Sequence, residues 1–302
     1  MPSRFDWDDL QFFLAVARAG TVSLAGRRLG VDHATVGRRI VALEEALGVK
    51  LFERTPRGYG LTRHGERLMA NAEAIETEAV RAEQALAGSS QRLTGSLRIS
   101  TLEGFGNFFL ASRIGAFVTA NPGLSVELIT IQQIVALSRR EADIAVTLAP
   151  PKTGRFVSEC LTDYRLFVYG SRSYLASHPP IRSREDLAAH PFAGYVDDLI
   201  FMRGLDYLTE IGPDLRARLQ NSSLHAQMEA AAAGFGLCVL PAYIASTRPE
   251  LVPVLRDTVS LLRSYWMVVH VDMAESAKVR LARQFIREQA AGAVSAFTGP
   301  SG

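Results

Sequence analysis

Cysteine is scarce in this chain of 302 residues, which contains only Cys160 and Cys238. Two cysteines, each in an apolar stretch, argue against a disulfide-stapled secreted fold and favour a reduced, cytoplasmic setting. The first ten residues are acidic and lack the apolar core of a signal peptide, so we expect no secretion signal. The longest uncharged run, residues 230–247, is interrupted by two glycines and a proline. We therefore interpret it as a helix end, a turn and a buried strand, and we expect no membrane association.

The sequence also lacks the residue patterns of common catalytic and metal sites. Its six histidines are not spaced as metal-ligand pairs, so we predict neither a metal site nor a bound cofactor. No G-x-S-x-G elbow and no phosphate-binding P-loop occurs. Gly104 and Gly106 are spaced as in a dinucleotide-binding turn, but Phe109 occupies the position of the third glycine. We therefore predict no catalytic residues and no enzymatic activity.

Charge is distributed unevenly along the chain. A hydrophobic content of 48% and a mean hydropathy of +0.09 allow a sizeable buried core in two or three folding units. The formal net charge is +2, but residues 27–63 contain eight Lys or Arg against four Asp or Glu. This excess of positive charge indicates an anionic partner for the N-terminal part of the chain.

Residues 32–48 show the pattern of a helix that reads DNA. Apolar positions 36, 40, 43 and 47 form one helical stripe, with Asp32 as a suitable N-cap and Gly48 at the C-terminal end. The outward face carries Thr35, Arg38 and Arg39, side chains suited to phosphates and base edges. A solvated surface is the alternative for the two arginines. A helix buried on one side and basic on the other predicts insertion into a major groove.

Shorter elements flank this helix. We expect a helix capped by Asp8 and ending at Ala19, and a second short helix opened by Ser23. Residues 50–62 are typical of two strands, a wing that lies along phosphates or in the minor groove. His33 is equally compatible with a base reader and with a bystander. The candidate DNA-binding residues are Ser23, His33, Ala34, Thr35, Arg38, Arg39, Arg54 and Arg57.

Residues 65–92 predict a linker helix that ends in a flexible joint. Its apolar positions alternate spacings of four and three, the pattern of a coiled-coil seam. We interpret this narrow stripe as a dimerisation surface, and packing against its own domain is the alternative. The seam consists of Leu68, Ala72, Ile75, Ala79, Ala82 and Leu86.

Residues 93–302 have an α/β pattern, which favours a mostly parallel sheet. We expect strands at 97–100, 126–129, 144–148, 166–169, 237–240 and 266–271, and helices at 109–118, 134–140, 185–189, 224–233 and 276–289. The predicted domains are residues 1–64, 65–92 and 93–302. In the last domain, lobe I comprises residues 93–162 and 269–302, and lobe II comprises residues 163–268. A cleft between two such lobes commonly holds a small ligand.

Two helix starts are candidates for the ligand-binding cleft, one on each lobe. Free backbone N–H groups at a helix N-terminus suit a carboxylate, although Glu103 would repel an anion and ordinary helix capping is the alternative. Tyr195 and Trp266 are candidates for the cleft wall, with burial in the core as the alternative. The candidate effector-binding residues are Ser100, Thr101, Leu102, Glu103, Tyr195, Asn221, Ser222, Ser223, His225 and Trp266.

The N-terminal third resembles the winged helix-turn-helix of LysR-type transcriptional regulators. That family pairs a run of the form SxxxAxxxLxVSQPAxSRxIxxLExxLGxxLFxR with a downstream LTxxG. The matching positions here are Ser23, Leu29, Val31, Arg38, Ile40, Leu43, Glu44, Leu47, Gly48, Leu51, Phe52, Arg54, Leu61, Thr62 and Gly65. Residues 139–145 (RREADIA) and 233–241 (AGFGLCVLP) resemble elements of the family's two regulatory subdomains. The resemblance therefore spans nearly the whole chain.

Two positions depart from the family pattern. Asp32, His33 and Ala34 stand where the family commonly has Ser-Gln-Pro, and Gly37 replaces the usual serine. His33 thus replaces a glutamine that can read adenine, so the family's base preference does not carry over.

The resemblance implies an α/β protein with an N-terminal winged helix-turn-helix, a long linker helix and a two-lobed effector domain of the periplasmic-binding-protein type. It implies a sequence-specific transcriptional regulator that binds a double-stranded DNA operator as a dimer, with a tetramer built from two dimers. It also implies control by a small-molecule effector, with an organic acid as one candidate. The alternatives are a stand-alone receptor of the periplasmic-binding-protein type and an α/β enzyme with an accessory DNA-binding domain.

Overall fold

The computed structural model describes residues 5–55, 58–86, 93–130, 142–200 and 203–299. The chain divides into two compact units, residues 1–91 and residues 92–302, and each is described by itself. Among the described residues, no helix is both long enough and apolar enough to span a bilayer.

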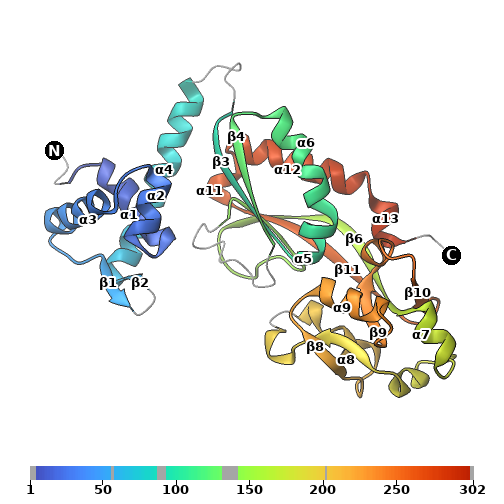
Figure 1. Cartoon of the computed structure of the whole chain (residues 1–302). Helices are drawn as coiled ribbons and strands as arrows, with labels where there is room; N and C mark the ends of the chain where they lie inside the picture. Colours follow the sequence, from blue (N-terminus) through green and yellow to red (C-terminus); the bar gives the residue numbers. More distant parts are fainter. Residues whose placement is uncertain (1–4, 56–57, 87–92, 131–141, 201–202, 300–302) are drawn as a thin grey trace. The chain divides into compact units, whose positions relative to one another are not determined.

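The N-terminal unit is a winged helix-turn-helix (Figure 1). Its elements are α1 (Asp8–Ala19), α2 (Val22–Leu29), α3 (His33–Leu47), β1 (Phe52–Thr55), β2 (Gly58–Leu61) and α4 (Arg63–Leu86). The predicted apolar stripe of α3 is confirmed, since Val36, Ile40 and Leu43 are buried against Leu10 and Phe13 of α1.

Side-chain caps fix where α2 and α3 begin. The expected cap on α3 is confirmed, because Asp32 accepts a hydrogen bond of 2.8 Å from the Thr35 amide. The two helices expected before α3 are confirmed, each starting within one residue of the prediction, but their expected capping residues are wrong. Thr21, not Ser23, caps α2, and Asp8 is the first residue of α1, which has no side-chain cap. The predicted and the observed capping residue of α2 both carry a hydroxyl group and are two positions apart, so N-cap preference alone did not distinguish them.

The wing formed by β1 and β2 is attached to the end of α1. The Tyr59 amide donates a 2.7 Å hydrogen bond to the Gly20 carbonyl. Gly58 has a φ of +123°, and a Cβ there would lie 2.3 Å from the same carbonyl oxygen, so only glycine fits this close approach. The rings of Phe13, Phe52 and Tyr59 pack together beneath the wing.

The first turns of α4 pack on their own domain, as in the alternative stated above. Ala72 is 1% exposed within the core of the N-terminal unit, so its assignment to an intermolecular seam is corrected, whereas Leu68 is only partly buried there and its assignment stays a prediction. Arg18 of α1 reinforces the packing through a 2.7 Å ion pair with Glu76. Ile75 and Ala79 are exposed, and the side chains of Ala82 and Leu86 lie outside the described residues.

The C-terminal unit is built on one mixed sheet, nine-stranded within the described residues. Its strands are β3 (Gly95–Thr101), β4 (Leu124–Thr130), β5 (Ile144–Thr147), β6 (Phe156–Ser171), β7 (Phe192–Tyr195), β8 (Ala217–Asn221), β9 (Leu237–Pro241), β10 (Leu251–Val254) and β11 (Ser260–His270). The order is β4-β3-β5-β11-β6-β9-β7-β8, with β10 paired to β6.

Parallel pairing is confined to the two lobes. Strands β3, β4 and β5 are parallel in lobe I, and β7, β8 and β9 are parallel in lobe II. The long strands β6 and β11 are antiparallel to each other and pass from one lobe to the other. The expected mostly parallel sheet is therefore corrected to two parallel halves joined by an antiparallel pair (Figure 1).

Helices cover the sheet in both lobes. They are α5 (Glu103–Phe105), the π-helical turn η1 (Gly106–Leu110), α6 (Ala111–Ala120), α7 (Arg172–Ser177), η3 (Glu185–Ala189), η4 (Asp197–Leu199), η5 (Arg203–Leu205), α8 (Tyr207–Ile211), α9 (Leu224–Ala232), α10 (Ala242–Ala245), α11 (Val271–Ala274), α12 (Ala277–Ala291) and α13 (Val294–Thr298). The helices expected at 109–118, 224–233 and 276–289 are confirmed within a few residues. The helix expected at 134–140 lies outside the described residues.

An aromatic cluster joins the lobes where β6 and β11 cross. Phe297 of α13 is fully buried among Phe105 and Phe109 of lobe I, Tyr243 of lobe II and Tyr265 of β11. The C-terminal helix therefore contributes to the core of both lobes.

Candidate DNA-binding surface and effector pocket

The exposed N-terminal end of α3 carries a prearranged arginine. His33, Ala34 and Arg38 are exposed on this helix. The Thr35 hydroxyl donates to Asp32 at 2.7 Å and accepts a 3.2 Å hydrogen bond from the Arg38 guanidinium. Hydrogen bonds from the Thr35 hydroxyl and amide hold the pKa of Asp32 below its usual value, so this carboxylate stays charged. These contacts restrict the rotamers of Arg38 while leaving it open to solvent.

Arg39 does not share this outward face. Its guanidinium pairs with Asp6 and Asp9, each at 3.0 Å, and lies 5.5 Å from the Phe12 ring centroid. One residue along a helix turns the side chain by about 100°, which directs Arg39 toward α1. The expectation of two outward arginines is therefore wrong in this structure, and only Arg38 of the two is unpaired with a carboxylate among the described residues.

The remaining candidates for DNA contact lie on α2 and the wing. Ser23 is exposed on the first turn of α2, and Arg54 is exposed on β1 opposite Tyr59 of β2. Arg57 lies outside the described residues.

Glu44 is a structural residue of this surface that the sequence analysis did not single out. It is 6% exposed on α3 and accepts hydrogen bonds from the amides of Leu51 (2.8 Å) and Phe52 (3.2 Å) while pairing with Lys50. Burial raises the pKa of Glu44, but these three partners outweigh burial and lower it overall. The sequence offered one signal for this role, a charged residue four positions after Ile40 and thus within the apolar stripe of α3. Glu44 therefore fixes the wing to the recognition helix.

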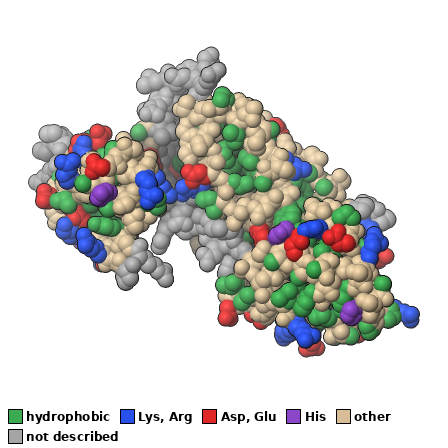
Figure 2. Space-filling view, in the orientation of Figure 1, with side chains coloured by type: hydrophobic (Ala, Val, Ile, Leu, Met, Phe, Trp, Pro, Cys, Tyr) green, Lys and Arg blue, Asp and Glu red, His purple; other side chains and the backbone are tan. Residues whose placement is uncertain are grey.

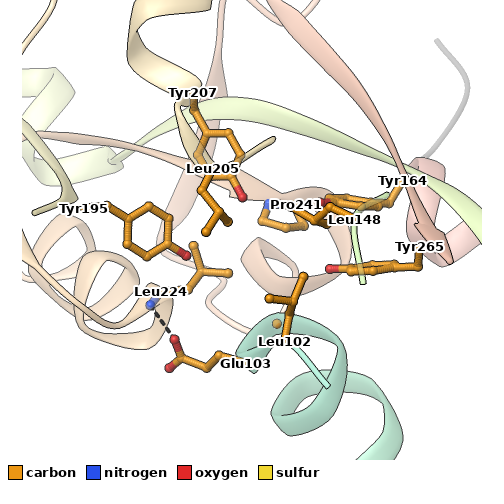
Figure 3. Close-up of a pocket in the computed structure, with 11 residues that line it drawn as sticks. Leu102, Glu103, Leu148, Tyr164, Tyr195, Leu205, Tyr207, Leu224, Pro241 and Tyr265 are labelled. Carbon is orange, nitrogen blue, oxygen red and sulfur yellow. Dashed lines mark hydrogen bonds between the residues drawn. The ribbon is translucent and has the colours of Figure 1, made fainter. Parts of the chain in front are cut away.

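A pocket opens between the two lobes of the C-terminal unit (Figure 3). Its empty space, including the part open to solvent, is about 340 Å³. It is lined by Leu102, Glu103, Gly104, Leu148, Tyr164, Tyr195, Leu205, Tyr207, Leu224, Pro241 and Tyr265. Among the described residues, the lining contains one charged side chain, that of Glu103.

The structure places only some of the expected residues at this pocket. Leu102, Glu103 and Tyr195 line it. Ser100 and Thr101 are buried in β3 and do not line it. Trp266 packs against the small core cluster of Ala142, Ala145 and Val268, so its assignment to the pocket wall is wrong. Adjacent residues on a strand face opposite sides, and Tyr265 takes the pocket side of β11.

The side-chain carboxylate of Glu103, the first residue of α5, lies at the N-terminus of α9. The sequence analysis expected a ligand carboxylate at this position. The oxygens of Glu103 accept hydrogen bonds from the Ser223 hydroxyl (2.7 Å), the Leu224 amide (2.7 Å) and the His225 amide (3.4 Å). The dashed line in Figure 3 marks the contact with Leu224. The expectation of free N–H groups at this helix is therefore wrong, because a carboxylate from lobe I already satisfies them.

The other residues at the start of α9 act as caps or interact with solvent. Asn221 accepts a 3.0 Å hydrogen bond from the Ser223 amide, and Ser223 accepts one of 3.2 Å from the Ala226 amide. Ser222 is exposed. His225 is exposed beside Glu229, which also pairs with Arg248. Figure 2 shows that acidic, basic and histidine side chains lie close together on parts of the visible surface. Helix capping, the alternative stated above, thus accounts for Asn221 and Ser223.

Tyrosines that the sequence analysis did not select form much of the pocket wall. The ring of Tyr164 stacks on that of Tyr265, with centroids 4.3 Å apart, and the Tyr265 hydroxyl lies 2.9 Å from the Tyr243 hydroxyl. Burial raises the pKa of Tyr164, Tyr195 and Tyr207, so all three are neutral phenols at neutral pH. The described residues include no cluster of three or more His, Cys, Asp or Glu able to hold a metal ion.

Comparison with known proteins identifies both units. The family model for the LysR substrate binding domain matches residues 90–291, and that for the bacterial regulatory helix-turn-helix protein of the lysR family matches residues 7–66. The glycine cleavage system transcriptional activator of Escherichia coli is 28% identical, over 95% of this chain and 95% of its own. The regulator CrgA of Neisseria meningitidis is 26% identical, over 93% of this chain and 96% of its own.

Solved structures share the fold of the whole chain. A full-length OxyR variant from Pseudomonas aeruginosa has a TM-score of 0.73 at 17% identity, covering 94% of this chain and 97% of its own. CrgA has a TM-score of 0.60 at 24% identity, covering 94% and 98%. The matched relatives are regulators rather than stand-alone receptors. The chain therefore belongs to the LysR family of transcriptional regulators, which bind DNA and carry an effector-binding domain.

Proposed function

We propose that this regulator contacts its operator through the exposed end of α3, with Arg38 as the main base-reading or phosphate-binding side chain. The observation that carries the proposal is the Asp32–Thr35–Arg38 chain of hydrogen bonds, which orients an exposed guanidinium on the recognition helix. We assign Ser23, His33, Ala34 and Thr35 to the same DNA-contacting surface, and we expect Arg54 and Arg57 of the wing to contact phosphate or the minor groove. Arg39 acts indirectly, by holding α3 against α1.

The proposed active species is a dimer that pairs through the exposed part of α4. Ile75 and Ala79 are exposed there and Leu68 is partly buried, whereas Ala72 is buried within the domain. Two such dimers would form a tetramer. An effector in the pocket between the lobes would change the packing of the C-terminal units, and with it the spacing or bend of the bound half-sites. Such control requires that the effector bind one arrangement more tightly than the other.

We expect Arg38→Ala to weaken operator binding by about 10- to 100-fold, because one oriented arginine contact contributes about 1–3 kcal/mol. The measurement is a gel-shift titration on an operator fragment from the DNA flanking the protein's gene, repeated at several salt concentrations. Arg184→Ala is the matched control, since it removes an exposed arginine from the C-terminal unit and leaves α3 intact. Equal affinity of the Arg38→Ala variant and the wild type would contradict the proposed contact.

We expect Arg54→Ala to lower affinity almost equally for operator and unrelated DNA, and to reduce the slope of affinity against salt by about one unit. A phosphate contact carries no base information, so the ratio of specific to non-specific affinity should hold. The same titrations with a scrambled fragment test this. Loss of discrimination between the two fragments would instead assign Arg54 to base recognition.

A further inference from the structure

The carboxylate of Glu103 joins the two lobes of the C-terminal unit (Figure 3). Glu103 begins α5 in lobe I, and its oxygens accept hydrogen bonds from the Ser223 hydroxyl and the Leu224 amide, each at 2.7 Å, at the start of α9 in lobe II. A longer bond of 3.4 Å comes from the His225 amide. Hydrogen bonds to a charged acceptor are stronger than neutral ones, and the positive end of the helix dipole adds to them. The contact therefore favours the arrangement in which the lobes lie together.

The start of α9 is the main source of positive potential for this carboxylate. No Lys, Arg or His is among the described residues that line the pocket. Arg263 lies near Tyr207 of the lining, but its guanidinium donates to Glu210 at 2.6 Å. If the lobes separate, Glu103 exchanges its bonds to α9 for bonds to water. The contact with α9 thus depends directly on how the lobes are arranged.

The backbone beside Glu103 packs closely against lobe II. A Cβ on Gly104 would lie 3.2 Å from the side chain of Ile244 and 3.3 Å from the Tyr243 hydroxyl. The ring centroids of Phe108 in η1 and His225 in α9 are 5.9 Å apart. The volume that the centre of a water molecule can occupy in the pocket is about 20 Å³, which is room for about one water. The two lobes are therefore closed on each other around Glu103.

We propose that Glu103 is an intramolecular latch, whose carboxylate occupies the start of α9 as a ligand carboxylate would and holds the two lobes closed. A ligand of this pocket has to open the latch to enter. An organic acid, the class of effector considered from the sequence, has to compete with Glu103 for the same amides. The consequence for DNA binding rests on the proposed effector control, whereas the latch itself rests on contacts within the C-terminal unit.

Removing the carboxylate and then restoring it tests the latch in the full chain. Glu103→Ala deletes a fragment equivalent to acetate, and acetate is added back at about 100 mM because so small a ligand binds weakly. We expect hydrogen exchange to rise at least about 10-fold in the first turn of α9, the effect of losing bonds to a charged acceptor. Exchange should also rise in α5 and η1 of lobe I. Acetate should reverse both changes, and acetamide, which has a similar shape but no charge, should not.

Asp186→Ala is the matched control. The Asp186 carboxylate also accepts two backbone amides, those of Arg182 and Ser183 at 2.8 Å each, but all three residues belong to lobe II. This variant should raise exchange only near position 186, and acetate should not change exchange in α9. For Glu103→Ala, three outcomes would overturn the latch: no rise in exchange, a rise confined to α9, or a rise that acetate does not reverse better than acetamide.

Gel shifts on the same samples test the proposed effector control separately. If closure of the lobes governs DNA binding, Glu103→Ala should change operator affinity, and acetate should return it toward the wild-type value. Unchanged affinity together with faster exchange in both lobes would contradict control through lobe closure and would still support the latch. Failure of the latch and failure of the proposed control are therefore distinguishable.

Discussion

Replacing Phe297 by alanine is expected to destabilise the C-terminal unit by about 3–5 kcal/mol, the cost of removing a fully buried phenylalanine. The ring centroid lies 4.7 Å from that of Phe109 in lobe I and 4.8 Å from that of Tyr243 in lobe II. Its removal would leave a cavity bounded by side chains from both lobes, which cannot collapse without moving one lobe against the other. We therefore expect loss of stability together with looser packing at the pocket.

Denaturant unfolding of the full chain in a Trp7→Phe background measures this effect, because Trp266 then reports on the C-terminal unit alone. Val294→Ala is the control on the same helix, since Val294 is 49% exposed and should change stability by less than about 0.5 kcal/mol. Hydrogen exchange should rise on both sides of the cavity, in η1 and in α10. Faster exchange confined to α13 would contradict a role for Phe297 in joining the lobes.

Periodicity predicted α3, which has one buried face, and short apolar runs predicted several strands, including β5 and β9, which are buried on both faces. The stripe on α3 and the apolar cores of β3, β4, β5 and β9 were all located from the sequence within a few residues. The full lengths of β6 and β11 were not predicted, because these strands pass from one lobe to the other. Exposed or half-buried polar residues such as Glu159 and Asp163 interrupt their apolar pattern, although the strands continue through paired hydrogen bonds.

The site was less predictable because its decisive contacts join residues far apart in the chain. Arg39 and Asp9 are 30 positions apart, and Glu103 and Ser223 are 120 positions apart. Sequence alone identified a carboxylate and a helix N-terminus on different lobes, but it did not show that each satisfies the other. The sequence analysis selected Trp266 for the pocket wall, whereas its neighbour Tyr265 lines the pocket. Both residues are aromatic, and the side of the strand on which each side chain lies decides which one faces the pocket.

Replacing Glu44 by alanine is expected to destabilise the N-terminal unit by about 2–4 kcal/mol and to abolish operator binding. The variant leaves the buried amides of Leu51 and Phe52 without acceptors, which costs more than the loss of an ordinary surface contact. Amide exchange at these two residues, followed by mass spectrometry or NMR, is the direct measurement. Glu45→Ala is the control, because Glu45 is the exposed neighbour on the same helix and should leave exchange unchanged.

The pH dependence of stability separates the charge of Glu44 from its shape. Because the folded-state pKa is lowered, the stabilisation is present in full above the unfolded pKa, about 4.3, and is lost as pH falls through the folded value. The difference in stability between the wild type and Glu44→Gln, which cannot ionise, should therefore be constant from pH 7 to about pH 5. It should shrink as the pH is lowered further. A difference that stays constant down to pH 3 (well below the unfolded pKa of about 4.3) would show that packing, rather than the carboxylate's hydrogen bonds to the wing, accounts for the role of Glu44.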